Sequence, residues 1–189
     1  NVMVLGCGLG QDDVARGAFD QALLQHPQAL FVLDADALAF LDIAMPLSYR
    51  AILTPHPLEA ARLLRCSTAQ VQADRIGAAR QLATQMRSVV VLKGAGTVIA
   101  TEQRYWINPT GNPALASAGS GDVLAGMIAA LAAQSSTVET EGVQAALAGT
   151  WLHGAAADRY GRDVGLVASD IAVLAVSAWA ELRYRSRAQ

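Results

Sequence analysis

The run Gly119-Ser120-Gly121-Asp122 combines residue types that anion binding and proton transfer require. The glycines on either side of Ser120 allow a tight turn that exposes successive backbone N–H groups. A helix is expected to begin near Asp122, and its positive end would face the same point. The carboxylate of Asp122 could accept the proton of an attacking hydroxyl group. The run therefore predicts a phosphate site and a general base within one turn.

The same four residues also fit an ordinary loop followed by a helix cap, because Ser and Asp are favoured capping residues. Two neighbouring features favour the functional interpretation. The run Asn108–Asn112 lies just upstream, and a long apolar helix pattern lies downstream. We therefore take Asp122 as the candidate base.

Two further glycine-rich runs follow strand patterns. Lys93-Gly94-Ala95-Gly96-Thr97 begins with a lysine that could hold a phosphate, although a lysine at a strand end is commonly just solvated. Gly6-Cys7-Gly8-Leu9-Gly10 resembles part of a dinucleotide-binding fingerprint, but the third glycine would have to stand at position 11, where the sequence has Gln11. A tight strand-to-helix turn is the better interpretation of that run.

Polar side chains also follow the second and third strand patterns. The spacing of Asp34 and Asp36 could direct both carboxylates to one side of a strand end, whereas a solvated turn is the plainer interpretation of each. His56 and Glu59 would occupy neighbouring positions in the first turn of a helix, where a glutamate often serves only as a cap. His153 lies in a helix of small residues and is interpreted as a packed core residue rather than a ligand.

Strands and helices alternate along the chain. Strands are predicted at Val2–Leu5, Leu30–Leu33, Ala51–Leu53 and Val89–Leu92, and a hairpin at Thr97–Ala100 and Tyr105–Ile107. Helices are predicted at Asp12–Gln25, Ala37–Leu41, Glu59–Leu64, Gln70–Met86, Asp122–Ala133, Val143–Tyr160 and Ser169–Arg183. This order predicts an α/β fold with a mainly parallel central sheet and helices on both faces. Ligands bind beyond the carboxyl ends of such strands, where the polar and glycine-rich runs lie.

Composition limits the partners. The 189 residues are 53% apolar and 16% charged, as expected of one soluble globular domain. A net charge of -2 gives no broad positive field for nucleic acid or acidic lipid, so an anion site must be local. The most apolar runs are shorter than the roughly 20 residues that span a bilayer. Cys7 and Cys66 are interpreted as free thiols in a reducing cytoplasm.

The longest motif carries a family resemblance. Asn108-Pro109-Thr110-Gly111-Asn112, followed by Ala118-Gly119-Ser120-Gly121-Asp122-Val123-Leu124-Ala125-Gly126, resembles the signature of the NAD(P)H-hydrate dehydratases, a branch of the ribokinase-like superfamily. Further runs agree in the same order, so the resemblance covers nearly the whole chain: Gly6–Gly10, Asp34–Leu38, Thr54–Leu63 and Leu92–Thr97.

This resemblance implies a three-layer ribokinase-like fold over residues 1–189 and a repair reaction on NADHX and NADPHX, the hydrated forms of NADH and NADPH. ADP or ATP would be the co-substrate and Mg²⁺ the metal, which Glu59 would organise indirectly. Gly8, His56 and Asp122 would contact the hydrated nucleotide. The implied contacts to ADP or ATP are Lys93, Gly94, Ala95, Gly96, Thr97, Asn112, Gly119, Ser120 and Gly121.

The sequence also departs from the family pattern. Cys7 stands where the family usually has proline, and Leu58 where it usually has glycine. Family members carry strands and helices ahead of the first glycine turn, so we expect an amino-terminal segment to be missing. The uncovered first strand could then pair with other chains, and a homo-oligomer is expected. Two other functions stay open: a small-molecule kinase of the same superfamily, such as a hydroxyethylthiazole or hydroxymethylpyrimidine kinase, and a non-catalytic nucleotide-binding module.

Overall fold

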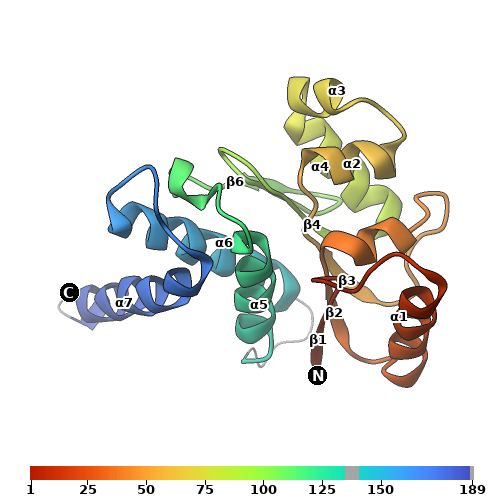
Figure 1. Ribbon diagram of the computed structural model, residues 1–189, viewed down its shortest axis with the longest axis horizontal. Helices are drawn as coiled ribbons and strands as arrows, with labels where there is room; N and C mark the ends of the chain where they lie inside the picture. Colours follow the sequence, from red (N-terminus) through yellow and green to blue (C-terminus); the bar gives the residue numbers. More distant parts are fainter. Residues whose placement is uncertain (135–140, 188–189) are drawn as a thin grey trace.

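A single sheet organises the molecule (Figure 1). The computed structural model describes residues 1–134 and 141–187, and within them six strands pair in the order β1-β2-β3-β4-β5-β6. The first four strands are parallel, and the last two are added antiparallel. The strands are β1 (Val2–Leu5), β2 (Leu30–Leu33), β3 (Arg50–Leu53), β4 (Val89–Leu92), β5 (Val98–Ala100) and β6 (Tyr105–Ile107). The predicted α/β fold with a mainly parallel sheet is confirmed.

Each face of the sheet has its own core. On β2, Phe31 and Leu33 pack into one cluster of buried residues, while Leu30 and Val32 pack into the cluster on the opposite face. Side chains alternate between the two faces of a strand, so a strand covered on both sides must be apolar at every position. This explains the continuous apolar runs of the central strands.

One face is covered by short helices that connect consecutive strands (Figure 1). They are α1 (Asp13–Gln25), the 3-10 helix η1 (Ala35–Phe40), α2 (Pro57–Leu64), α3 (Thr68–Ala73) and α4 (Arg75–Met86). The prediction of helix throughout Gln70–Met86 is wrong at Asp74. There the backbone leaves the helical conformation, and the Asp74 side chain accepts the Gly77 N–H at 2.7 Å, so it caps the start of α4.

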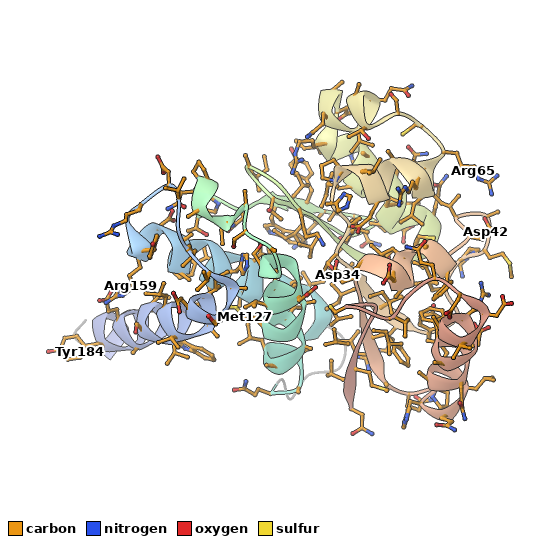
Figure 2. The ribbon with its side chains drawn as sticks, in the orientation of Figure 1. Asp34, Asp42, Arg65, Met127, Arg159 and Tyr184 are labelled. Carbon is orange, nitrogen blue, oxygen red and sulfur yellow. The ribbon has the colours of Figure 1, made fainter. Side chains whose placement is uncertain are left out.

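Two further helices cover the other face, and a third packs outside them. α5 (Ser120–Ala132) contacts β1 and β2, and α6 (Glu141–Tyr160) contacts β3 and β4. α7 (Ala168–Arg187) packs against α5 and α6 on the side away from the sheet, and a short 3-10 helix η2 (Pro113–Leu115) precedes α5 (Figures 1 and 2). No helix within the described ranges is long and apolar enough to cross a membrane.

The parallel strands gather polar groups at one edge. β1, β2, β3 and β4 end at that edge, so the residues that follow them lie there too: Gly6, Asp34, Thr54 and Lys93. The amino-terminal end of α5 reaches the same edge. The fold thus brings distant segments of the chain together beyond the carboxyl ends of the strands, as expected for an α/β sheet.

Two helical glycines allow a matched test of the packing between α5 and α6. A Cβ added at Gly149 of α6 would lie 2.7 Å from Ile128 Cγ1 and 3.2 Å from Ile128 Cα, whereas a Cβ at Gly126 of α5 would have nothing within 4 Å. We expect Gly126→Ala to stabilise the fold by about 0.5–1 kcal/mol through the better helix propensity of Ala. Gly149→Ala should destabilise it by about 1–3 kcal/mol because α5 must move away. Urea unfolding of both variants checks the prediction, which fails if the two shifts have the same sign.

Candidate active site

A buried ion pair lies at the centre of the polar edge. The side chain of Asp34 is 2% exposed, and its Oδ1 lies 2.5 Å from Lys93 Nζ. The same ammonium group lies 3.9 Å from Glu59 Oε2. A carboxylate taken out of water needs such a counter-ion. The interpretations of Asp34 as part of a solvated turn and of Lys93 as a merely solvated lysine are therefore wrong.

The start of α5 lies over this ion pair. Gly119 adopts a left-handed conformation with φ of 80°, and a Cβ added at Gly121 would lie 3.5 Å from Lys93 Nζ and 3.6 Å from Asp34 Oδ2. Among the described residues, the N–H groups of Gly121 and Asp122 have no hydrogen-bond acceptor. The predicted tight turn is present, and its amides point from the positive end of a helix, as an anion site requires.

Ser120 holds this turn in place. Its hydroxyl donates to the Leu115 carbonyl at 2.7 Å, its N–H donates to the Ser117 carbonyl at 3.2 Å, and its own carbonyl lies 2.9 Å from His153 Nε2. Burial lowers the pKa of His153, so the ring is neutral and Nε2 carries the proton that the carbonyl accepts. The prediction that His153 is a packed core residue is confirmed, and its contact also fixes the glycine turn from α6.

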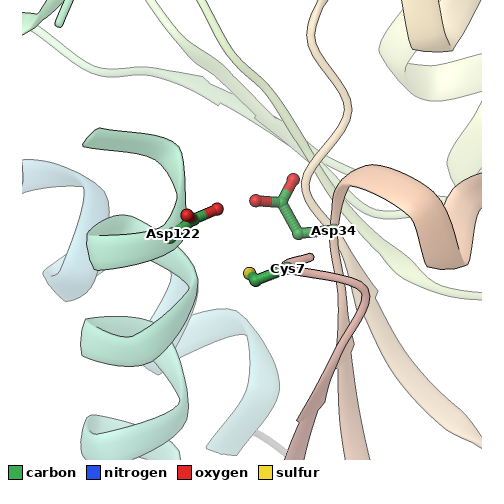
Figure 3. A group of neighbouring side chains, drawn as sticks. All are labelled: Cys7, Asp34 and Asp122. Atoms are coloured by element: carbon green, nitrogen blue, oxygen red, sulfur yellow. The ribbon is translucent and has the colours of Figure 1, made fainter. Parts of the chain in front are cut away.

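Asp122 and Asp34 approach each other beside a cysteine (Figure 3). One carboxylate oxygen of each aspartate and the Cys7 sulfur lie within 4.8 Å of one another. Partial burial of the Cys7 side chain, then hydrogen bonding to Asp122 and the negative charges of Asp122 and Asp34, raise the pKa of the thiol to about 12. Cys7 and Cys66 are both free, as predicted, and Cys7 carries a proton at neutral pH.

The first glycine turn is held by Asp36. Gly6, Gly8 and Gly10 all have positive φ, and a Cβ at Gly6 would collide with the Asp34 carbonyl oxygen. Asp36 accepts the Gly10 N–H at 2.9 Å and the Gln11 side-chain amide at 2.8 Å. These hydrogen bonds, that of Gln11 first, lower the pKa of Asp36. The two aspartates thus have separate roles, since Asp34 pairs with Lys93 and Asp36 shapes the turn that contains Gly8.

His56 and Glu59 form a reciprocal cap at the start of α2. His56 Nδ1 accepts the N–H groups of Leu58 and Glu59 at 3.1 and 3.3 Å, and Glu59 Oε2 accepts the His56 N–H at 2.7 Å. Glu59 Oε1 lies 3.3 Å from His56 Nε2. The capping interpretation of Glu59 is confirmed. The carboxylate also faces Lys93, so the cap is part of the site as well.

A cavity of about 380 Å³ lies on the Lys93 side of the glycine turn. Its lining includes every residue of the run Lys93–Thr97 together with Asn112, Ser120 and Gly121. Arg75 supports this wall, because its guanidinium donates to the carbonyls of Leu92 and Lys93 at 3.1 and 3.4 Å. The Thr97 hydroxyl donates to the Gly94 carbonyl at 2.9 Å and closes the loop.

The opposite wall is tied to α6. Asn112 donates its side-chain amide to the Ala157 carbonyl at 2.8 Å and accepts the Ala114 N–H at 3.0 Å. Asn108 is buried and donates to the Thr110 carbonyl at 3.0 Å, while the Thr110 hydroxyl donates to the Trp151 carbonyl at 2.9 Å. The motif Asn108–Asn112 therefore positions a wall of the cavity. Asn112 lines that cavity with both ends of its side-chain amide already engaged.

Comparison with known proteins decides the family. A family profile described as NAD(P)H-hydrate dehydratase matches residues 1–176. The chain belongs to the NAD(P)H-hydrate dehydratase family. The resemblance carried by the glycine-rich runs is thereby confirmed, and the runs lie together at one edge of the sheet.

Several known proteins are similar to this chain. An ADP-dependent (S)-NAD(P)H-hydrate dehydratase of Neisseria meningitidis is 46% identical over 91% of this chain, which spans 59% of that protein's length. A Bacillus subtilis ADP/ATP-dependent NAD(P)H-hydrate dehydratase, co-crystallised with ATP/Mg²⁺, has a TM-score of 0.85 and 34% identity, covering 95% of this chain and 64% of the other. A ribokinase-like superfamily protein of Enterococcus faecalis has a TM-score of 0.77 and 28% identity, with 93% and 62% covered. The fold is ribokinase-like, as predicted.

The structure adds participants that the sequence did not reveal. Arg75 supports the loop that follows Lys93, His153 supports the turn at Ser120, and Cys7 lies between two carboxylates. The departure of Cys7 from the family pattern was the one signal available. Arg75 and His153 carried none, because their partners lie far away in the sequence.

The thiol of Cys7 reports on the charge of Asp122. In a Cys66→Ser background, alkylation of Cys7 by iodoacetamide at pH 8 should be slow, because little thiolate exists below a pKa of about 12. Asp122→Asn removes a hydrogen bond and a charge that raise this pKa, and each unit regained increases the thiolate fraction about tenfold. Mass spectrometry over time should show faster labelling in Asp122→Asn and the parent rate in Asp13→Asn, an exposed control. Equal rates in both variants would contradict the arrangement.

Proposed function

We propose that this chain carries out the ADP- or ATP-dependent dehydration of NADHX and NADPHX to NADH and NADPH. The observation that carries the proposal is the start of α5, where Asp122 and amides without an acceptor among the described residues lie over the Asp34–Lys93 pair beside a cavity. Family membership and the names of the relatives support the same reaction. The chain spans 59% of the length of the Neisseria relative, so the activity of that whole protein is a proposal for this chain.

The nucleotide is proposed to occupy the 380 Å³ cavity. Its terminal phosphate would lie against the amides of Gly121 and Asp122, which have no acceptor among the described residues. Oriented amides in a partly dry site stabilise the charge that develops on a transferred phosphoryl group. Lys93 supplies a positive charge next to the same point while it neutralises Asp34.

Asp122 is proposed to act as the general base. The ring hydroxyl of the hydrated nicotinamide would give its proton to this carboxylate and attack the terminal phosphorus, releasing the shortened nucleotide. Phosphate then leaves from the ring carbon, a proton leaves the neighbouring carbon, and the double bond is restored. Gly8 and His56 are the proposed contacts to the hydrated nucleotide, because Gly8 belongs to the turn whose Cys7 lies beside Asp122 and His56 belongs to the cap whose Glu59 faces Lys93.

Magnesium suits the oxygen groups at this edge. Both oxygens of Glu59 face His56 groups, so the carboxylate is well oriented, and an indirect contact through water fits it better than direct coordination. Mg²⁺ would neutralise the charge of the donor phosphates, with the phosphates and water as its direct ligands. The Cys7 sulfur is too soft to share in such a site. A cytoplasmic location and a homo-oligomeric state stay predictions from the sequence.

Product analysis separates this proposal from its rivals. A dehydratase regenerates the absorbance of NADH at 340 nm and releases phosphate, whereas a small-molecule kinase leaves a phosphorylated alcohol. A non-catalytic module binds nucleotide without turnover. Incubation of the protein with NADHX, ADP or ATP, and Mg²⁺ should restore absorbance at 340 nm. Failure to do so, with ADP binding intact, would contradict the proposal.

Asp122→Asn tests the proposed base. The amide keeps the shape of the side chain but cannot accept the hydroxyl proton, so kcat should fall by roughly 10²–10⁴. Affinity for ADP, measured by calorimetry, should change little, because the amides of the turn remain. Asp13→Asn, which changes an exposed aspartate at the start of α1, serves as the carboxylate control and should keep the parent kcat. Near-normal turnover by Asp122→Asn would remove Asp122 from the mechanism.

Gly121→Val tests the phosphate turn. A Cβ at this position makes ordinary contacts with Lys93 Nζ and Asp34 Oδ2, but the two methyl groups of Val would fill the space above the ion pair. ADP or ATP affinity should be largely lost while the circular dichroism spectrum stays that of the folded protein. Gly121→Ala, which adds only the tolerated Cβ, should lose less. Unchanged affinity in the Val variant would show that the phosphates bind elsewhere.

A further inference from the structure

A second cavity, of about 680 Å³, lies between η1 and α2. It shares no lining residue with the 380 Å³ cavity, and the two approach each other at the Glu59–Lys93 pair, since Glu59 lines the larger and Lys93 the smaller. The proposed reaction centre therefore lies between two separate cavities. In the proposed function the phosphoryl donor occupies the smaller cavity, which leaves the larger one, on the side of Gln11 and Glu59, for another ligand.

Among the described residues, one charged side chain that lines the larger cavity has no hydrogen-bond or ion-pair partner. Asp36 is occupied by Gly10 and Gln11, Glu59 by His56, and Asp42 by Arg65 at 3.2 Å. Figure 2 shows the last pair, Asp42 and Arg65, side by side at the outer end of this region. Arg62 also lines the cavity, and within the described part of the chain its guanidinium has no hydrogen-bond or ion-pair partner.

Apolar side chains form another part of the lining. Leu41, Ile43 and Leu63 line the cavity beside the charged groups. Half of the lining residues are apolar and half are polar or charged, so the cavity offers both kinds of contact to an organic ligand, and its volume lies within the usual range for a ligand of drug size. A ligand that matches this lining has a flat apolar ring and an anionic group, and an unpaired guanidinium is well suited to phosphate.

We propose that this cavity receives the adenosine-phosphate half of the hydrated dinucleotide and that Arg62 binds a phosphate of that half. The inference rests on the proposed function, because it assumes that the reacting nicotinamide lies near Asp122. From that point the rest of the dinucleotide must leave the reaction centre on the side away from the donor, past Glu59. Arg62 then distinguishes a dinucleotide from smaller alcohols, which do not reach it.

Calorimetry with unreactive probes tests the subsite without turnover. The full 189-residue chain is saturated with ADP, so that the smaller cavity is filled, and is titrated with NADPH, NADH and adenosine 2′,5′-bisphosphate. Arg62→Gln should weaken the binding of NADPH about tenfold, the usual order for one exposed charge-assisted contact. Arg62→Lys should recover part of the loss. Arg80→Gln, an exposed arginine on α4 outside this cavity, should bind as the parent does.

The pattern of losses identifies the phosphate. A loss for NADPH and the bisphosphate but not for NADH places the 2′-phosphate on Arg62, while an equal loss for NADPH and NADH places the diphosphate there. Parent-like binding of all three probes by Arg62→Gln, or no binding of any probe by the parent, overturns the inference. ADP affinity, measured in every variant, monitors the fold.

Turnover measurements keep the two proposals distinguishable. If Arg62→Gln raises the KM for NADPHX or NADHX about tenfold and leaves kcat unchanged, both the subsite and the function hold. Binding that depends on Arg62 in a chain that does not dehydrate either hydrate would leave the subsite standing and remove the proposed function. Normal dehydration with an unchanged KM in Arg62→Gln would do the opposite.

Discussion

The carboxylate of Asp34 is almost completely removed from water, and the ammonium group of Lys93 is the charge that makes this tolerable. Asp34 follows β2 and Lys93 follows β4, so the pair spans β3 and forms only when the three strands are in register. Loss of Lys93 would leave the buried carboxylate of Asp34 uncompensated, which typically costs about 3–5 kcal/mol. The ion pair therefore links the stability of the sheet to the position of the lysine that faces Glu59 and the start of α5.

The second half of the site is held by α6 rather than by the sheet. His153 fixes the carbonyl of Ser120, and the carbonyls of Trp151 and Ala157 fix Thr110 and Asn112. A phosphate turn at the start of a helix has little rigidity of its own, because its amides lack intrahelical acceptors. Hydrogen bonds from a buried helix supply that rigidity and leave the amides of Gly121 and Asp122 available.

The strands and most helices could be predicted because their signals are local. An apolar run such as Leu30–Leu33 followed by a polar residue reads as a buried strand, and glycine-rich runs mark the turns after the strands. The break at Asp74 was missed, since an aspartate inside a run of helix-forming residues does not by itself indicate that a new helix begins there. The burial of Asp34 could not be predicted either, because it depends on a lysine from another strand and a helix that follows much later. The glycine-rich run and the family resemblance made Asp122 a candidate base, whereas Arg75 and Arg62 acquire their surroundings only in the folded chain.

The docking of α5 on β1 and β2 has a consequence for how the molecule folds. Neighbouring strands of the sheet follow one another in the sequence, so each can pair with the strand before it over a connection shorter than the segment between Asp34 and Asp122. Contact between Asp122 and Asp34 instead closes a loop that contains most of the sheet, and the entropy cost of closure rises with loop length. The candidate active site is thus among the last long-range contacts expected to form during folding, and a chain that has formed it has already completed its topology.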